Sequence, residues 1–123
     1  MSQGIELIIV GAGGFAREVR GMLPSFELGD GTTFKGYLAQ DTGVAGATDV
    51  SDQILASPED YQPQPQDRFV LAIGNMDARE RVVTMLGERG GRFLTLVHPR
   101  ALVAETARLD EGVLVYPFAT VSN

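Results

Sequence analysis

The stretch IELIIVGAGGFAREV, residues Ile5–Val19, decides the fold of this chain. Its first part, Ile5–Val10, is an almost unbroken apolar run, which is typical of a strand buried on both faces of a parallel sheet. The turn Gly11–Gly14 follows, and apolar residues then recur at helical spacing until Pro24 ends the helix. This order predicts a phosphate-binding loop, because glycine lets the backbone approach a ligand and the helix N-terminus offers free N–H groups. A tight turn without a ligand is the alternative.

Three more apolar runs predict further strands, at Phe34–Leu38, Phe69–Ile73 and Phe93–Val97. A helix is expected to begin at Ser57 and another at Asp77, because both residue types are good helix caps. Strands that alternate with helices imply an α/β fold, here with a four-stranded parallel sheet and right-handed crossovers. Ligands of such folds lie at the carboxyl ends of the strands.

Composition limits the classes of function that need to be considered. The chain has 123 residues, 44% of them hydrophobic, a net charge of -6 and no cysteine. The acidic balance argues against binding to nucleic acid or to an anionic membrane. The absence of cysteine excludes disulfides and thiolate chemistry. No signal peptide and no membrane-spanning stretch is visible, so a cytoplasmic protein without a metal site is expected.

The pattern changes after His98, where aliphatic residues recur every six positions, at Val103, Leu109, Val115 and Val121. A period of six fits neither a helix nor a hairpin, but it is typical of a β-helix built from hexapeptides. Three hexapeptides make one triangular coil, so about one coil is expected before the chain ends. A solenoid needs about three repeats to bury its core. We therefore expect a domain of residues 1–97, followed in residues 98–123 by the first coil of a truncated β-helix.

Two kinds of ligand for the glycine loop stay open from the sequence: a dinucleotide and a nucleotide sugar. The loop matches the pattern G-x-G-x-x-G/A, which both kinds of site use. A dinucleotide site favours an acidic residue at the end of the second strand, where this chain has Ala39 and Gln40. Asp41 lies a few residues beyond the usual spacing. The dinucleotide interpretation is weakened but stays open.

Three polar residues have both a structural and a functional interpretation. Asn75 follows the third strand and either bonds a ligand hydroxyl or begins a helix. Arg79 either reaches a ligand anion or is a solvated helix residue, which is the commoner outcome. His98 is the only histidine, and without a neighbouring acid or nucleophile it is expected to be a structural residue rather than a general base.

Three motifs together resemble one family, the bacterial sugar O- and N-acyltransferases of the PglD/NeuD type. GAGGFAREV is similar to that family's opening motif G-A-G-G-H-G-R-E-V, LAIGNMDAR to its A-I-G-D/N motif with a following Arg, and LVHPRALV to its hinge into the hexapeptides. The resemblance spans the whole chain in order. It implies a Rossmann-like domain that binds a nucleotide sugar, followed by a left-handed β-helix.

The resemblance also implies an activity for the full-length protein. A histidine deprotonates an amino or hydroxyl group of the sugar, which attacks the thioester of acetyl-CoA, the co-substrate of a homotrimeric acetyltransferase. The family's histidine lies beyond Asn123, so this chain is expected to contain no catalytic residue, to hold no acetyl-CoA and to transfer no acetyl group. Phe15 and Ala16 stand where the family has His-Gly, and Ala39-Gln40-Asp41 stands where it often has three aspartates.

The sequence thus predicts a site for a UDP- or dTDP-linked sugar. Its expected residues come from the carboxyl ends of three strands and the elements that follow them: Gly11, Ala12, Gly13, Gly14, Phe15, Ala39, Gln40, Asp41, Gly74, Asn75 and Arg79. Two functions of other classes stay open. One is a fragment of an NAD- or FAD-binding oxidoreductase, and the other is a naturally short sugar-nucleotide sensor without catalytic activity.

Overall fold

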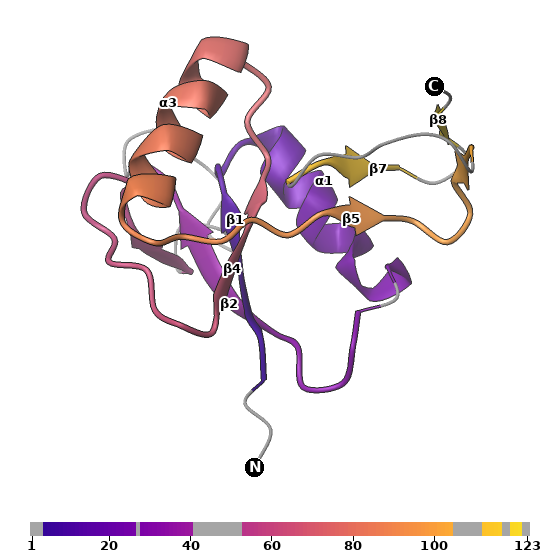
Figure 1. Ribbon diagram of the computed structural model, residues 1–123, viewed down its shortest axis with the longest axis horizontal. Coiled ribbons are helices and arrows are strands. Elements are labelled where there is room, and N and C mark those ends of the chain that lie inside the picture. The colour runs from indigo at the N-terminus through magenta and orange to yellow at the C-terminus, as the bar shows by residue number, and fades with distance from the viewer. Residues whose placement is uncertain (1–3, 27, 41–52, 105–111, 117–118, 122–123) are drawn as a thin grey trace.

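The computed structural model describes residues 4–26, 28–40, 53–104, 112–116 and 119–121. The elements run in the following order (Figure 1): β1 (Glu6–Val10), α1 (Gly14–Met22), the 3-10 turn η1 (Leu23–Ser25), β2 (Thr33–Leu38), β3 (Ile54–Ala56), β4 (Asp67–Leu71), α3 (Met76–Glu88), β5 (Leu96–Val97), β6 (Leu102–Val103), β7 (Leu114–Val115) and β8 (Thr120–Val121).

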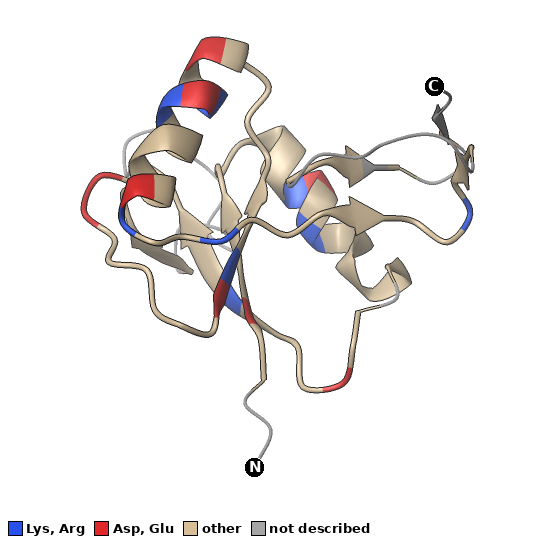
Figure 2. Cartoon of the chain, viewed as in Figure 1, with Lys and Arg blue, Asp and Glu red and all other residues tan. Residues whose placement is uncertain are grey.

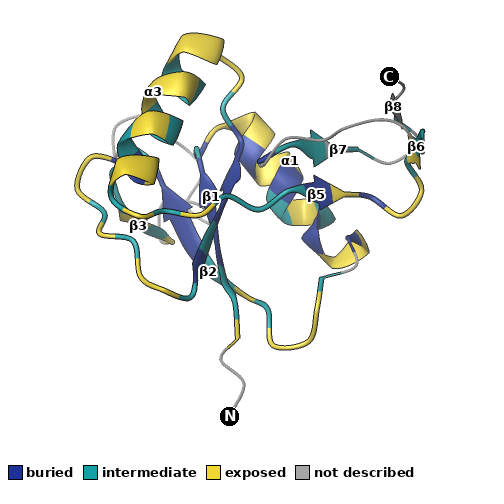
Figure 3. Ribbon diagram, in the orientation of Figure 1, coloured by how far each residue is buried: buried dark blue, intermediate teal, exposed yellow. Residues whose placement is uncertain are grey.

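The centre of the molecule is a four-stranded parallel sheet in the order β3-β2-β1-β4. Successive residues of β1 face opposite layers. Leu7 and Ile9 pack with α1, whereas Ile8 and Val10 pack with Leu86 of α3. Because helices cover both faces, the β1 stretch Leu7–Val10 is at most 1% exposed, and Figure 3 shows β1 as buried. The predicted α/β class and the four-stranded parallel sheet are confirmed.

The fourth strand of this sheet differs from the predicted one. It is the short edge strand β3, which follows an Asp- and Gly-rich segment and pairs with β2. Of the predicted strand Phe93–Val97, only Phe93 meets the sheet, through a single parallel bridge to Phe69. Beyond it, Leu96 turns into the core cluster on the α1 side and begins a separate ladder. The predicted strand is therefore divided between two packing environments.

The structure also differs from the prediction at two expected helix starts. Ser57 begins a hydrogen-bonded turn, in which its hydroxyl accepts from the Asp60 N–H at 3.3 Å, and no helix follows. The helix predicted from Asp77 begins earlier, because the Asn75 side chain caps it by accepting from the Ala78 N–H at 2.9 Å. Asp77 lies in the first turn instead, where its charge favours the positive end of the helix.

A buried acid ties the start of β4 to its neighbours. Asp67 is 2% exposed, and its carboxylate accepts from Lys35 Nζ at 3.0 Å, from the Tyr61 hydroxyl and from the Gln64 N–H at 2.8 Å. Burial raises the pKa of Tyr61, and its hydrogen bond to Asp67 adds to the shift. Burial alone lowers the pKa of Lys35, but its hydrogen bonds to Tyr61 and Asp67 outweigh this effect and raise it.

The four strands after α3 form two short parallel ladders beside the main sheet. Leu96 pairs with Leu114 in one, and Leu102 pairs with Thr120 in the other. In both ladders the partners lie eighteen residues apart, which equals three hexapeptides. Figure 1 shows β5 and β7 side by side next to α1. Of the four residues in the predicted six-residue period, Leu109 and the side chains of Val115 and Val121 lie outside the described residues, and Val103 is half-buried.

Contacts from α1 and α3 hold this C-terminal segment against the domain. The Arg79 guanidinium donates to the Gly112 carbonyl at 3.0 Å, and the Gly112 N–H donates to Thr95 Oγ1 at 2.9 Å. Phe15, at the start of α1, lies against Tyr116 with ring centroids 6.4 Å apart. Burial raises the pKa of Tyr116, and the charge of Glu18 and a hydrogen bond to it add to the shift.

Candidate functional site

At the carboxyl edge of the sheet, backbone hydrogen bonds hold the first residues after three strands in place. The Gly11 N–H donates to the Leu38 carbonyl at 2.8 Å, the Ala39 N–H to Ala56 at 3.0 Å and the Ala72 N–H to Val10 at 2.9 Å. These bonds continue the strand ladders past the last paired residues. The chain therefore leaves β1, β2 and β4 along one edge, where parallel α/β sheets bind ligands.

The glycines of the first loop have different reasons to be glycine. Gly11 has a φ of +119°, and a Cβ there would lie 2.5 Å from the Ala72 carbonyl oxygen. The backbone conformation and this close contact within the protein therefore explain why residue 11 is glycine. A Cβ on Gly13 or Gly14 would meet nothing within 4 Å, and neither has a left-handed φ. Nothing in the described part of the chain requires glycine at these two positions, whereas a ligand that approaches the backbone would.

The two long helices also differ at their N-terminal ends. The N-terminus of α3 is capped by Asn75 and has Asp77 in its first turn. The N-terminus of α1 begins after Gly13, has no side-chain cap and has no acidic residue in its first turn. The free N–H groups and the positive dipole end of α1 are thus left for an anion.

A cavity of about 450 Å³ opens at the same edge, between β2 and α3. Its volume is within the range of small-molecule sites. Its walls are mostly aliphatic and come from the ends of β1 and β2, from the turn after β3, from the loop after β4 and from α3: Val10, Gly11, Leu38, Ala39, Pro58, Ile73, Ala78, Val82 and Met85. Gly11 both lines the cavity and begins the loop that leads to α1, so the cavity and the glycine loop are continuous.

Three polar side chains complete the lining of this cavity: Gln40, Glu59 and Arg81. All three are exposed, and the amide nitrogen of Gln40 donates to Glu59 Oε2 at 2.7 Å. This bond joins the end of β2 to the turn after β3. The cavity therefore combines apolar walls with a carboxylate, an amide and a guanidinium that a ligand can reach.

The structure brings some of the predicted site residues together and separates others. Gly11, Ala39 and Gln40 line the cavity, and Gly13 and Gly14 lie at the open start of α1. Ala12 is 8% exposed and packs in the core. Phe15 faces Tyr116 and Arg79 bonds Gly112, so both side chains contact the C-terminal segment. Gly74 and Asn75 lead into α3, and Asp41 lies outside the described residues.

Sequence reasoning missed Pro58, Glu59 and Arg81 as part of this site. The sequence predicts a helix at Pro58 and Glu59. Only the pairing of β3 with β2 brings their turn to the sheet edge. Arg81 has a weak signal in the sequence, because it lies one helical turn before Met85, which also lines the cavity. Choosing Arg81 over Arg79 required the orientation of α3.

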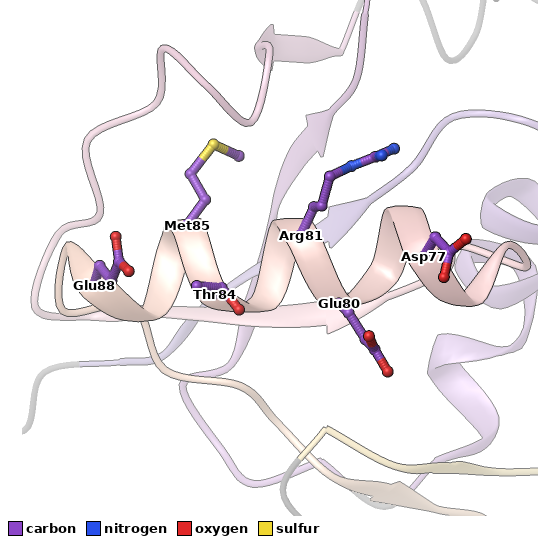
Figure 4. Close-up of a pocket in the computed structure, with 6 residues that line it drawn as sticks. All are labelled: Asp77, Glu80, Arg81, Thr84, Met85 and Glu88. Atoms are coloured by element: carbon purple, nitrogen blue, oxygen red, sulfur yellow. The ribbon is translucent and has the colours of Figure 1, made fainter.

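A second hollow lies on the outer surface of α3, and all its lining residues belong to that one helix: Asp77, Glu80, Arg81, Thr84, Met85 and Glu88. Figure 4 shows Arg81 and Met85 pointing to one side of the helix and Glu80 to the other. Although its volume, about 570 Å³, exceeds that of the edge cavity, no second element in the described part of the chain lines it. It is the solvent face of an amphipathic helix.

Charge and membrane features add little to the choice of function. Figure 2 shows acidic and basic residues interspersed along α3. Within the described ranges, no three His, Cys, Asp or Glu side chains are grouped so that they could hold a metal ion. None of the helices that the structure describes has the length and the apolar character to cross a membrane.

His98 has a structural environment. It is 6% exposed, its ring meets Phe26 edge-on with centroids 5.3 Å apart, and its Nδ1 accepts from the Arg100 N–H at 3.0 Å. The hydrogen bond occupies Nδ1, and the contact with Phe26 holds the ring in place. The geometry agrees with the structural interpretation of this residue.

The fold and the edge site together define an α/β domain of the Rossmann-like class. A family model described as the PglD N-terminal domain matches residues 6–86, which is more than half of the chain. The protein belongs to the PglD N-terminal domain family. The predicted resemblance to acyltransferases of the PglD type is confirmed.

Individual relatives agree with this family. UDP-N-acetylbacillosamine N-acetyltransferase of Bacillus subtilis (strain 168) is 35% identical over 51 residues, or 42% of this chain and 24% of that protein. PerB from Caulobacter crescentus, in complex with CoA and GDP-perosamine, is 25% identical with a TM-score of 0.73, over 99% of this chain and 56% of PerB. The acetyltransferase domain of PglB from Neisseria gonorrhoeae FA1090 shares the fold, with a TM-score of 0.68 and 22% identity over 94% of this chain and 55% of that chain. The chain thus spans from about a quarter to just over half of these relatives' lengths.

Proposed function

We propose that this chain is the nucleotide-sugar-binding part of a sugar acetyltransferase, with the nucleotide sugar at the carboxyl edge of the sheet. The observation that carries the proposal is the pair Gly13 and Gly14 at the uncapped start of α1, because no contact with the described residues requires glycine there. A diphosphate there would be held by backbone N–H groups and the helix dipole. The adjoining cavity has room for the rest of the nucleotide.

The proposed activity of the full-length protein is acetyl transfer from acetyl-CoA to an amino or hydroxyl group of the bound sugar. Family membership supports it, as do relatives described as N-acetyltransferases. We assign none of the described residues to acetyl-CoA and none to catalysis, since His98 is held in a structural contact. The predicted homotrimer stays a prediction for the full-length protein.

We further propose that residues 98–123 begin a left-handed β-helix and that residues 1–97 form the binding domain. The parallel ladders with partners eighteen residues apart support this division, because one triangular coil of three hexapeptides returns to its start after that distance. The contacts of Arg79 and Thr95 with Gly112 would then fix the first coil relative to the binding domain.

Ligand-dependent stabilisation tests the binding proposal. Unfolding is followed by thermal shift with GDP-, UDP-, dTDP- and CMP-linked sugars, and with NAD and FAD. A sugar nucleotide at a hundred times its dissociation constant should stabilise the fold by about 2.7 kcal/mol. Stabilisation by NAD or FAD alone would instead favour the oxidoreductase alternative. The predicted preference for a UDP- or dTDP-linked sugar stays a prediction.

A further inference from the structure

We propose that Glu59, held by Gln40, selects guanine as the base of the bound nucleotide, an inference that rests on the nucleotide-sugar site proposed above. The two side chains are the only carboxylate and the only amide that line the cavity within the described residues. They come from different elements, and their hydrogen bond of 2.7 Å joins the end of β2 to the turn after β3. The carboxylate is therefore placed by the fold.

The position of Glu59 in the cavity suits the base rather than the phosphates. The glycine loop and the open N-terminus of α1 attract negative charge, whereas a carboxylate repels it. Glu59 lies beside the aliphatic walls that Leu38, Pro58 and Val82 contribute, and apolar walls are what a flat aromatic ring packs against. A base in the cavity and a diphosphate at α1 would place each part of the nucleotide in a matching environment.

The hydrogen-bond donors and acceptors along the edge of each base then decide which base a carboxylate prefers. An ionised carboxylate only accepts hydrogen bonds, and it can accept two in parallel. Guanine offers two adjacent donors, N1–H and the N2 amino group. Uracil and thymine offer one N–H between two carbonyl oxygens, which would face the carboxylate oxygens. Adenine and cytosine each set one amino group beside an unprotonated ring nitrogen. Guanine alone satisfies both oxygens of Glu59, while the Gln40 amide remains able to donate to a base carbonyl.

Calorimetric titration of the 123-residue chain with GDP, IDP and UDP tests the inference. IDP is the informative probe, because its base keeps N1–H but lacks the N2 amino group. We expect GDP to bind about tenfold more tightly than IDP and more tightly still than UDP, since a site built around a hydrogen bond rejects the analogue that lacks it. Glu59→Gln should reduce GDP affinity about tenfold and remove the difference between GDP and IDP.

Glu88→Gln is the matched control, because it makes the same change of charge on the solvent face of α3. It should leave all three affinities within twofold. UDP binding as tight as GDP, or a GDP preference that survives Glu59→Gln, would overturn the guanine inference and leave the nucleotide-sugar site standing. Failure of all three diphosphates to bind, with the fold intact by circular dichroism, would overturn the proposed site and the inference together.

Discussion

At the scale of single residues, we expect the same substitution to have different effects at Gly11 and at Gly13 of the first loop. Gly13→Val should abolish stabilisation by a nucleotide sugar and leave the fold intact, because its side chain enters open space that we assign to the diphosphate. Gly11→Val should unfold or strongly destabilise the chain, by about 3 kcal/mol or more, since its Cβ would collide with the Ala72 carbonyl at a positive φ. Thermal unfolding with and without ligand measures both effects. If Gly13→Val binds the nucleotide sugar as wild type does, the loop is a turn that does not bind the ligand.

A second prediction at this scale concerns His98. His98→Asn keeps an acceptor for the Arg100 N–H, whereas His98→Ala removes the side-chain acceptor of this partly buried donor. We expect His98→Ala to be less stable than His98→Asn by about 1 kcal/mol, and both to bind nucleotide sugars as wild type does. Denaturant unfolding and calorimetry provide the two readouts. Loss of binding in both variants would contradict the structural role assigned to this histidine.

At the scale of elements, the Asp67 cluster joins β2, β4 and the segment before β4. The pKa values of Lys35 and Tyr61 are both raised in the folded state. A group with a raised folded pKa stabilises the protein below its unfolded pKa, and this stabilisation is lost as the pH rises through the folded value. The free energy of unfolding should therefore fall above about pH 10.

Asp67→Asn tests this cluster. The substitution removes the charge that holds Lys35 and Tyr61, so we expect it to cost about 2 kcal/mol at neutral pH and to flatten the decline at alkaline pH. Urea unfolding from pH 7 to 11 measures both effects. Asp60→Asn, in the exposed turn nearby, is the control and should follow the wild-type profile. An unchanged alkaline slope in Asp67→Asn would contradict the assignment.

At the scale of the whole molecule, Arg79 connects the helix beside the site to the C-terminal segment. Removing its bond to the Gly112 carbonyl should loosen the ladder of β5 and β7. In Arg79→Ala we expect the Leu96 and Gly112 amides to exchange with solvent about tenfold faster, which corresponds to the loss of about 1.4 kcal/mol. The exposed Arg92→Ala is the control. If Arg79→Ala loses nucleotide affinity while amide exchange stays unchanged, the arginine acts on the ligand instead, as the sequence alone had allowed.

The sequence by itself determined three of the four strands of the sheet, the glycine loop and the family. These features depend on local signals: the apolar run of β1, the spacing of Gly11 and Gly13, and the six-residue period after His98. The tertiary structure decided which residues line the candidate cavity. Whether Arg79 or Arg81 faces the cavity depends on the rotation of α3, and Glu59 meets Gln40 only because β3 pairs with β2 across a long separation in the chain. Neither fact has a local cause, because helix orientation and edge pairing are set by packing between distant segments.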